Sequence, residues 1–165
     1  MKKHYCIIVF MSIFSLCFSQ TNKFDLLKGK IYLNITEIPE FSTFKQVQSA
    51  LLDSLNGFSY AVTDLRRNDT AILLLEKLHP SGTYNKFEIL DILQINSLKE
   101  GNVICFQRCQ KDSVADPELL ALVKFEESKE VFEIIYQAWR ADIKSGKFYP
   151  VDTHNIRCLN YFIID

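Results

Sequence analysis

The fold class of this chain depends on how residues 42–58 are interpreted, and they read STFKQVQSALLDSLNGF. Apolar side chains recur here at three- and four-residue steps, at Phe44, Val47, Leu51, Leu55 and Phe58. This spacing predicts one amphipathic helix, and Leu51 lies at the centre of the stripe that should face the core. Ser42 or Thr43 can cap its start. Gly57 can end it, because a left-handed residue at a helix end is free of strain only for glycine.

The segments on either side of this predicted helix have the alternation or the short apolar runs that are typical of β-strands. They lie at residues 29–35, before the helix, and then at 70–78, 87–95, 102–110, 119–125, 131–142, 148–151 and 156–162. Because the connections are short, we expect neighbouring strands to pair antiparallel. The order of elements predicts an α+β fold, in which one helix packs on a curved antiparallel sheet of about five to seven strands. Cystatin-like folds have this order of elements, which is a likeness of architecture and carries no function.

Several of the predicted strands are apolar on both faces. In residues 70–78, Ile72 and Leu74 oppose Leu73 and Leu75. A single helix covers part of one face, so the other face must meet the curl of the sheet, the N-terminal segment, a partner subunit or a ligand. A homodimer that forms through a sheet face is one of these possibilities.

Residues 1–19 have the layout of a cleaved secretory signal. Lys2 and Lys3 precede the apolar run 6–18, which is shorter than the roughly 20 residues that a membrane span needs. The alternative is a buried N-terminal strand or helix. We predict cleavage after Ser19, or after Gln20, which exports the protein to the periplasm or outside the cell. The mature form then has no membrane span and is a single α+β domain of residues 20–165.

The composition argues against several partners. Loss of Lys2 and Lys3 lowers the formal net charge from −1 to −3, and no basic face of the kind that binds nucleic acid is evident. The chain has five glycines and neither a P-loop nor a dinucleotide fingerprint, so we predict no cofactor.

Three cysteines remain after cleavage, namely Cys105, Cys109 and Cys158. Together with His154 they form two pairs at a spacing found in structural zinc sites. On a single strand, however, the Cα atoms of Cys105 and Cys109 would lie about 13 Å apart. That distance is too long for one zinc ion or for a disulfide between these two cysteines. We therefore predict no metal site.

Side chains that could support catalysis lack a recognisable setting. A Cys–His nucleophile would pair Cys105 or Cys109 with His79 or His154. Nothing in the sequence around either cysteine would lower its pKa, and both histidines lie in polar turns. Asp91 is the most unusual carboxylate, because it lies inside an apolar strand. A buried carboxylate would need a partner such as an arginine or a backbone N–H, so we expect Asp91 at an edge or facing solvent. No catalytic residue is predicted.

The C-terminal part of the chain contains a series of short motifs. They are DPELLALVK at 116–124, AWRAD at 138–142, GKF at 146–148 and IRCLN at 156–160. This series resembles a set of small exported proteins of Bacteroidota, over about residues 87–160 of this chain. That family has no assigned activity, so the resemblance implies no catalytic residue. It implies that Cys109 and Cys158 are the two recurring cysteines, whereas Cys105 lies outside the pattern.

In an oxidising compartment we expect Cys109 and Cys158 to pair and Cys105 to stay a buried thiol. The function that fits these observations is an exported, non-enzymatic domain that binds a protein partner or supports an envelope assembly. One alternative is a small inhibitor or binding module that acts on an envelope or extracellular enzyme. Another is a hydrolase that uses a thiol or carboxylates. A groove that holds Cys105 or Cys109 beside His154 would favour the enzyme, whereas a flat apolar sheet face would favour binding.

Overall fold

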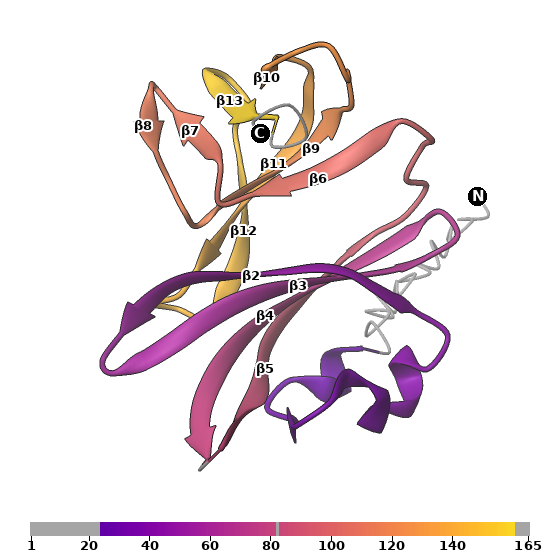
Figure 1. Cartoon of the computed structure of the whole chain (residues 1–165), viewed down its shortest axis with the longest axis vertical. Helices are drawn as coiled ribbons and strands as arrows, with labels where there is room; N and C mark the ends of the chain where they lie inside the picture. The colour runs from indigo at the N-terminus through magenta and orange to yellow at the C-terminus, as the bar shows by residue number, and fades with distance from the viewer. Residues whose placement is uncertain (1–23, 82, 161–165) are drawn as a thin grey trace, which may run out of the picture.

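The computed structural model describes residues 24–81 and 83–160, and within them it contains β-strands and three 3₁₀ turns but no α-helix (Figure 1). The turns are η1 (Asp25–Leu27), η2 (Ile35–Glu37) and η3 (Pro39–Phe41). The strands are β1 (Ile31–Tyr32), β2 (Lys45–Leu55), β3 (Phe58–Arg67), β4 (Thr70–Ser81), β5 (Tyr84–Ile95), β6 (Asn102–Phe106), β7 (Cys109–Lys111), β8 (Val114–Ala115), β9 (Leu119–Lys124), β10 (Val131–Phe132), β11 (Ile135–Asp142), β12 (Lys147–Val151) and β13 (Ile156–Leu159). The predicted signal segment, residues 1–19, lies outside the described residues.

The predicted α+β fold is wrong, because the segment assigned to the helix is strand β2. β2 pairs antiparallel with β3, from Lys45 opposite Arg66 to Leu55 opposite Phe58. Asn56 and Gly57 join the two strands, with φ values of 54° and 79°. An Asn-Gly pair in which both residues have positive φ is the typical two-residue turn of a β-hairpin. Gly57 therefore ends a strand and not a helix.

Leu51, which the helical stripe placed in the core, is 57 % exposed. On a strand, alternate side chains point to opposite faces. In β2 it is Leu52 and, less deeply, Ala50 that pack into the core, while Leu51 points away from it. The prediction for Leu51 is therefore wrong for the same reason as the helix.

The strands form three antiparallel sheets rather than one curved sheet. The N-terminal sheet has the order β1-β5-β4-β3-β2, the central sheet β12-β11-β9-β6 and the outer sheet β10-β13-β7-β8. Every strand pairing in the described residues is antiparallel, as the short connections predicted. Figure 1 shows the three sheets one above another, with the N-terminal segment below them.

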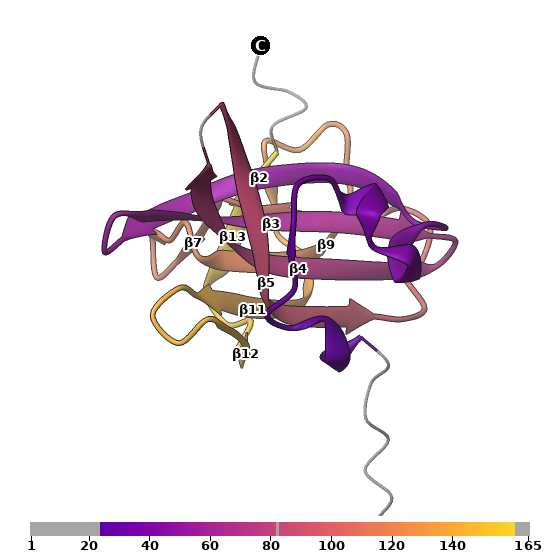
Figure 2. The ribbon, with the colours of Figure 1, turned by 90° about the horizontal axis from the view of Figure 1, so that it is seen from below.

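The stacking of these layers explains why so many strands are apolar on both faces. In β4, Leu73 and Leu75 pack against side chains of the central sheet, including Trp139. Ile72 and Leu74 point the other way and pack under the N-terminal segment, which lies across β3, β4 and β5 in Figure 2. This segment was one of the four covers considered from the sequence.

The central sheet is also covered on both faces. In β9, Leu120 and Leu122 face the N-terminal sheet, whereas Leu119, Ala121 and Val123 face the outer sheet. The apolar faces that suggested a homodimer through a sheet face are thus largely covered within the chain itself. The homodimer stays a prediction.

Two predicted strands are divided between sheets. Residues 102–110 form β6 in the central sheet and β7 in the outer sheet, and the chain turns between them at Gln107, which has a φ of 68°. Residues 131–142 likewise form β10 and β11. The described residues contain no helix that is long and apolar enough to cross a membrane.

Candidate functional site

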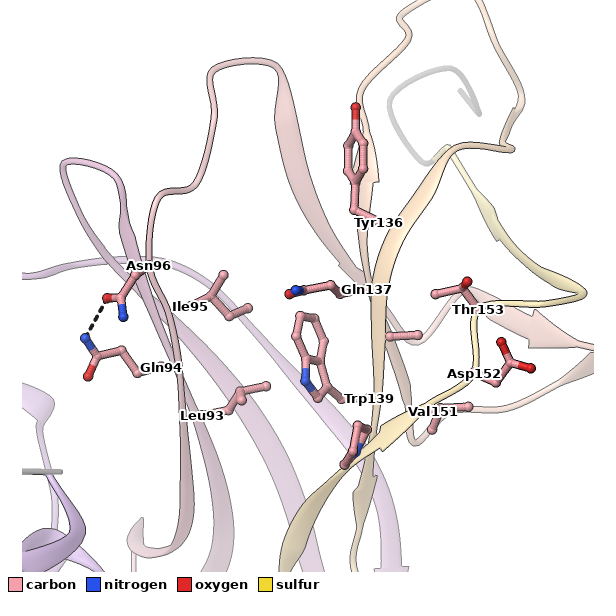
Figure 3. A pocket seen from close by; sticks show the side chains of 12 residues that line it. Leu93, Gln94, Ile95, Asn96, Tyr136, Gln137, Trp139, Val151, Asp152 and Thr153 are labelled. Atoms are coloured by element: carbon pink, nitrogen blue, oxygen red, sulfur yellow. Dashed lines mark hydrogen bonds between the residues drawn. The ribbon is translucent and has the colours of Figure 1, made fainter. Parts of the chain in front are cut away.

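An open groove of about 590 Å³ lies between the C-terminal part of β5 and the strands β11 and β12 (Figure 3). It therefore separates an edge region of the N-terminal sheet from an edge of the central sheet. Its lining residues are Leu93, Gln94, Ile95, Asn96, Tyr136, Gln137, Ala138, Trp139, Pro150, Val151, Asp152 and Thr153.

The floor of the groove is apolar. Trp139 is buried in the core between the two sheets, where Leu93 and Ile95 also pack. The backbone at Trp139 pairs with Leu120 on one side and Pro150 on the other, and the indole is held by its packing in the core. A ligand that enters the groove meets a rigid apolar surface, which is the usual setting of a binding pocket.

The rim of the groove carries amide side chains. Gln94 Nε2 donates a hydrogen bond to Asn96 Oδ1 at 2.7 Å, and Figure 3 shows this pair on the β5 side. Gln137 extends from β11 towards β5 above the Trp139 ring. Each amide offers both donors and an acceptor. In Figure 3, however, Gln94 and Asn96 point away from Trp139, on the other side of β5 from Leu93 and Ile95. Gln137 is therefore the amide of these three that faces the groove and can bind a polar group of an uncharged ligand.

The groove continues past Tyr136 into a second hollow of about 220 Å³. Both hollows share Ile95, Asn96, Tyr136 and Gln137. Tyr136 is 49 % exposed and lies at an irregularity of the β11–β9 pairing, between Ile135 and Gln137. Bulges of this kind re-aim side chains and are frequent beside functional sites. An extended ligand would fit the two joined hollows better than a compact one.

The charges in the groove are few and of opposite sign. Asp152 lines the first hollow and Lys99 lines the second. Asp152 is the sole carboxylate among the lining residues of the first hollow. The described lining of this hollow therefore offers a single carboxylate, whereas many hydrolases perform acid–base catalysis with a pair.

The structure contains the predicted disulfide between Cys109 and Cys158. The two cysteines lie directly opposite each other on β7 and β13 of the outer sheet. Neither of them lines the groove. The bond therefore cross-links two strands of the outer sheet, and both sulfur atoms are unavailable as metal ligands or nucleophiles.

Cys105 is a free and buried thiol, as predicted. Burial raises its pKa to about 12, so the thiol is neutral and unreactive at physiological pH. The placement of Cys105 and Cys109 on one strand is wrong, however. The first lies on β6 and the second on β7 of a different sheet, where Cys109 Sγ is 3.8 Å from the carbonyl oxygen of Cys105.

The remaining residues considered for chemistry also lie outside the groove. His79 Nε2 lies 2.6 Å from Glu88 Oε2, between β4 and β5. His154 is exposed beyond the end of β12. Within residues 24–81 and 83–160 no group of three or more His, Cys, Asp or Glu side chains is placed to hold a metal ion. Cys105, Cys109 and Cys158 do not meet His79 or His154 in this groove.

Asp91 is not at a solvent-facing position, because its side chain is 14 % exposed. Its Oδ2 accepts a hydrogen bond from the backbone N–H of Phe148 at 2.8 Å, and its Oδ1 lies 2.8 Å from Lys28 Nζ. The hydrogen bond with Asp91 is the main cause of a raised pKa at Lys28. Asp91 thus connects the N-terminal segment, β5 and β12.

Glu76 on β4 is a fully buried carboxyl that the sequence analysis did not single out. It accepts hydrogen bonds from the hydroxyls of Tyr32 and Thr63, the latter at 2.8 Å. Burial raises the pKa of Glu76 to about 7, although both hydrogen bonds act in the opposite direction. The group lies under the N-terminal segment, on the face of the sheet that is turned away from the groove.

The groove residues themselves were not predicted as a site. Their signal in the sequence is weak, since Gln94 and Gln137 are single amides inside apolar strands. Such residues suggest a functional position only after the sheets are known to stack beside each other.

Comparisons of the chain with protein-family models, with curated proteins and with solved structures find no match.

Proposed function

We propose that this chain is an exported, non-enzymatic binding domain, and that its groove between β5, β11 and β12 binds a protein partner in the envelope or outside the cell. The groove carries the proposal, because it combines an apolar floor at Trp139 with the amide of Gln137 at its rim. Export is supported by the signal-like residues 1–19 and is compatible with the Cys109–Cys158 disulfide.

A binding role fits the groove better than catalysis. The buried thiol of Cys105 and the bonded sulfur atoms of Cys109 and Cys158 offer no thiolate to a substrate. In the first hollow, Asp152 has no second carboxylate beside it. The amide of Gln137, which faces the groove, can bind polar groups without exchanging protons at neutral pH.

Export is tested by mass spectrometry of the protein recovered outside the cytoplasm. Its N-terminus should be Gln20 or Thr21, as expected for cleavage after Ser19 or one residue later. Recovery of the folded protein with an intact Met1 would contradict the export part of the proposal.

The groove is tested with the substitution Gln137→Arg, which places a long charged side chain in the opening. Gln46→Arg is a matched control, because Gln46 is also an exposed strand glutamine and lies on β2, at the far edge of the N-terminal sheet. A tagged wild-type chain and the control should capture the same envelope protein, and Gln137→Arg should lose it. Equal capture by all three would show that the groove is not the binding site.

A further inference from the structure

Within residues 24–81 and 83–160, the outer edge of β5 lacks a partner strand over its C-terminal half. On that side β1 pairs with Phe87 and Glu88, and the backbone of Ile89 bonds to Gly29 and Lys30. Beyond them, in residues 91–95, no backbone group of the described chain pairs with this edge. The unpaired edge borders the groove, since the side chains of residues 93–95 line it.

An unpaired edge is a template for another strand, and proteins usually protect it with lysine, proline, a bulge or a covering segment. Residues 91–95 read DILQI and contain neither lysine nor proline. The bulge in β5 comes earlier, where Leu75 and Glu76 pair with Asp91 and Ile89 and skip the residue between them. At Asp91 this edge meets Lys28 and the N–H of Phe148. Among the described residues it is left open beyond Asp91, where residues 92–95 are uncharged.

Two other edge strands, β12 and β2, are protected against strand addition. β12, on the opposite side of the groove, contains Lys147 and Pro150, and proline cannot donate to an added strand. β2, at the far edge of the N-terminal sheet, begins at Lys45 and has two irregularities in its pairing with β3. The contrast makes residues 91–95 of β5 the position best suited to accept a strand.

We infer that an extended, uncharged segment of the partner binds as an added β-strand along residues 91–95 of β5. This inference rests on the proposed function and specifies the form of the partner. Backbone hydrogen bonds to β5 supply affinity, and alternate side chains of the added strand point into the groove. An apolar side chain meets the floor formed by Leu93, Ile95 and Trp139, while the amide of Gln137 binds a polar group at the rim.

The first experiment selects phage-displayed random peptides of about ten residues, long enough for one strand, on the purified exported chain. Peptides that bind the Gln137→Arg variant equally well are discarded. We expect the remaining peptides to be uncharged and to have apolar residues at alternate positions. Failure to enrich any peptide over this variant would overturn the inference.

The second experiment distinguishes strand addition from other binding in the groove. Backbone N-methylation of a selected peptide should lower its affinity about tenfold at alternate positions and have little effect at the positions between them, because alternate N–H groups of a strand point to its neighbour. Hydrogen exchange should slow in residues 91–95 of the protein when the peptide binds. An affinity without this alternation, together with unchanged exchange, would overturn strand addition but leave the proposed groove intact.

A glycan is the other class of ligand that a groove lined by an aromatic ring and an amide could bind. Affinity electrophoresis with laminarin, xylan and mannan tests this alternative. If one of these slows the wild type but not Gln137→Arg, the inferred peptide is wrong although the groove is still a binding site. No retardation in any of the three gels, together with the alternating N-methyl effect, would support the peptide. The envelope capture described above tests the proposed function separately.

Discussion

Replacing Glu76 with glutamine should make the protein more stable at neutral and alkaline pH and leave its stability in acid almost unchanged. Burial raises the pKa of Glu76 from 4.5 to about 7. In the unfolded chain this carboxyl ionises near its ordinary value. Between these two values the folded state binds the proton and the unfolded state does not, so the free energy of unfolding falls as the pH rises.

The size of the effect follows from the difference between the two pKa values. Each unit corresponds to 1.36 kcal/mol, so the wild type should lose about 3 kcal/mol between pH 4.5 and pH 8 through this group. Glutamine has the shape of the protonated acid and can accept the hydrogen bond from Tyr32 and pair with the Thr63 hydroxyl. The variant Glu76→Gln should therefore keep the stability that the wild type has in acid.

Urea denaturation at several pH values measures this directly, because Trp139 is the single tryptophan of the sequence and is buried in the core. Its fluorescence should report the unfolding of the N-terminal and central sheets together. Glu133→Gln is the matched control, since Glu133 is exposed and its loss should leave the pH dependence in place. If Glu76→Gln and the wild type lose stability in parallel as the pH rises, the reasoning about a buried neutral carboxyl is refuted.

Three further predictions concern stability and can be checked by the same urea denaturation. Leu74→Ala should cost about 2–5 kcal/mol, because Leu74 is fully buried, whereas Leu51→Ala should change the stability by less than about 0.5 kcal/mol; similar losses would contradict the strand assignment of β2. The double variant Cys109→Ala/Cys158→Ala should lose about 4 kcal/mol, the chain-entropy value for a bond between residues 49 apart. Asp91→Ala should lose about 1–3 kcal/mol, because the N–H of Phe148 then has no acceptor; an unchanged stability would show that this contact is not formed in solution.

The helix was predicted in place of β2 because one spacing fits both structures. Val47, Leu51 and Leu55 are four residues apart. Four residues are close to one helical turn, but they are also two full periods of a regular strand, so the spacing alone does not distinguish the two. In β2, Val47 and Leu51 are exposed, and the irregularity between Leu51 and Ser54 turns Leu55 back to the core. The Asn56-Gly57 pair before the alternating segment of β3 was the better signal, because this pair is typical of a hairpin turn.

The strands were easier to predict than their arrangement. Residues 70–78, 87–95 and 119–125 were assigned correctly because apolar runs of that length, with short connections, favour antiparallel strands. Their apolar side chains on both faces also showed that a second cover was needed. The sequence could not show that the chain changes sheets after Phe106 and again after Phe132, because such changes depend on which strands meet across the layers.

The stacked layers also bear on where this protein can bind another molecule. Strands β4 and β9 have both faces buried inside the chain, so their apolar side chains are not accessible to a partner. A partner can reach the core only where the sheets end. The groove is such a place, because residues of β5 and Trp139 of β11 line it together. A site of this kind is built by residues from strands that are distant in sequence. Its chemistry, an open backbone edge beside an amide and an apolar floor, therefore becomes evident only once the order of the sheets is known.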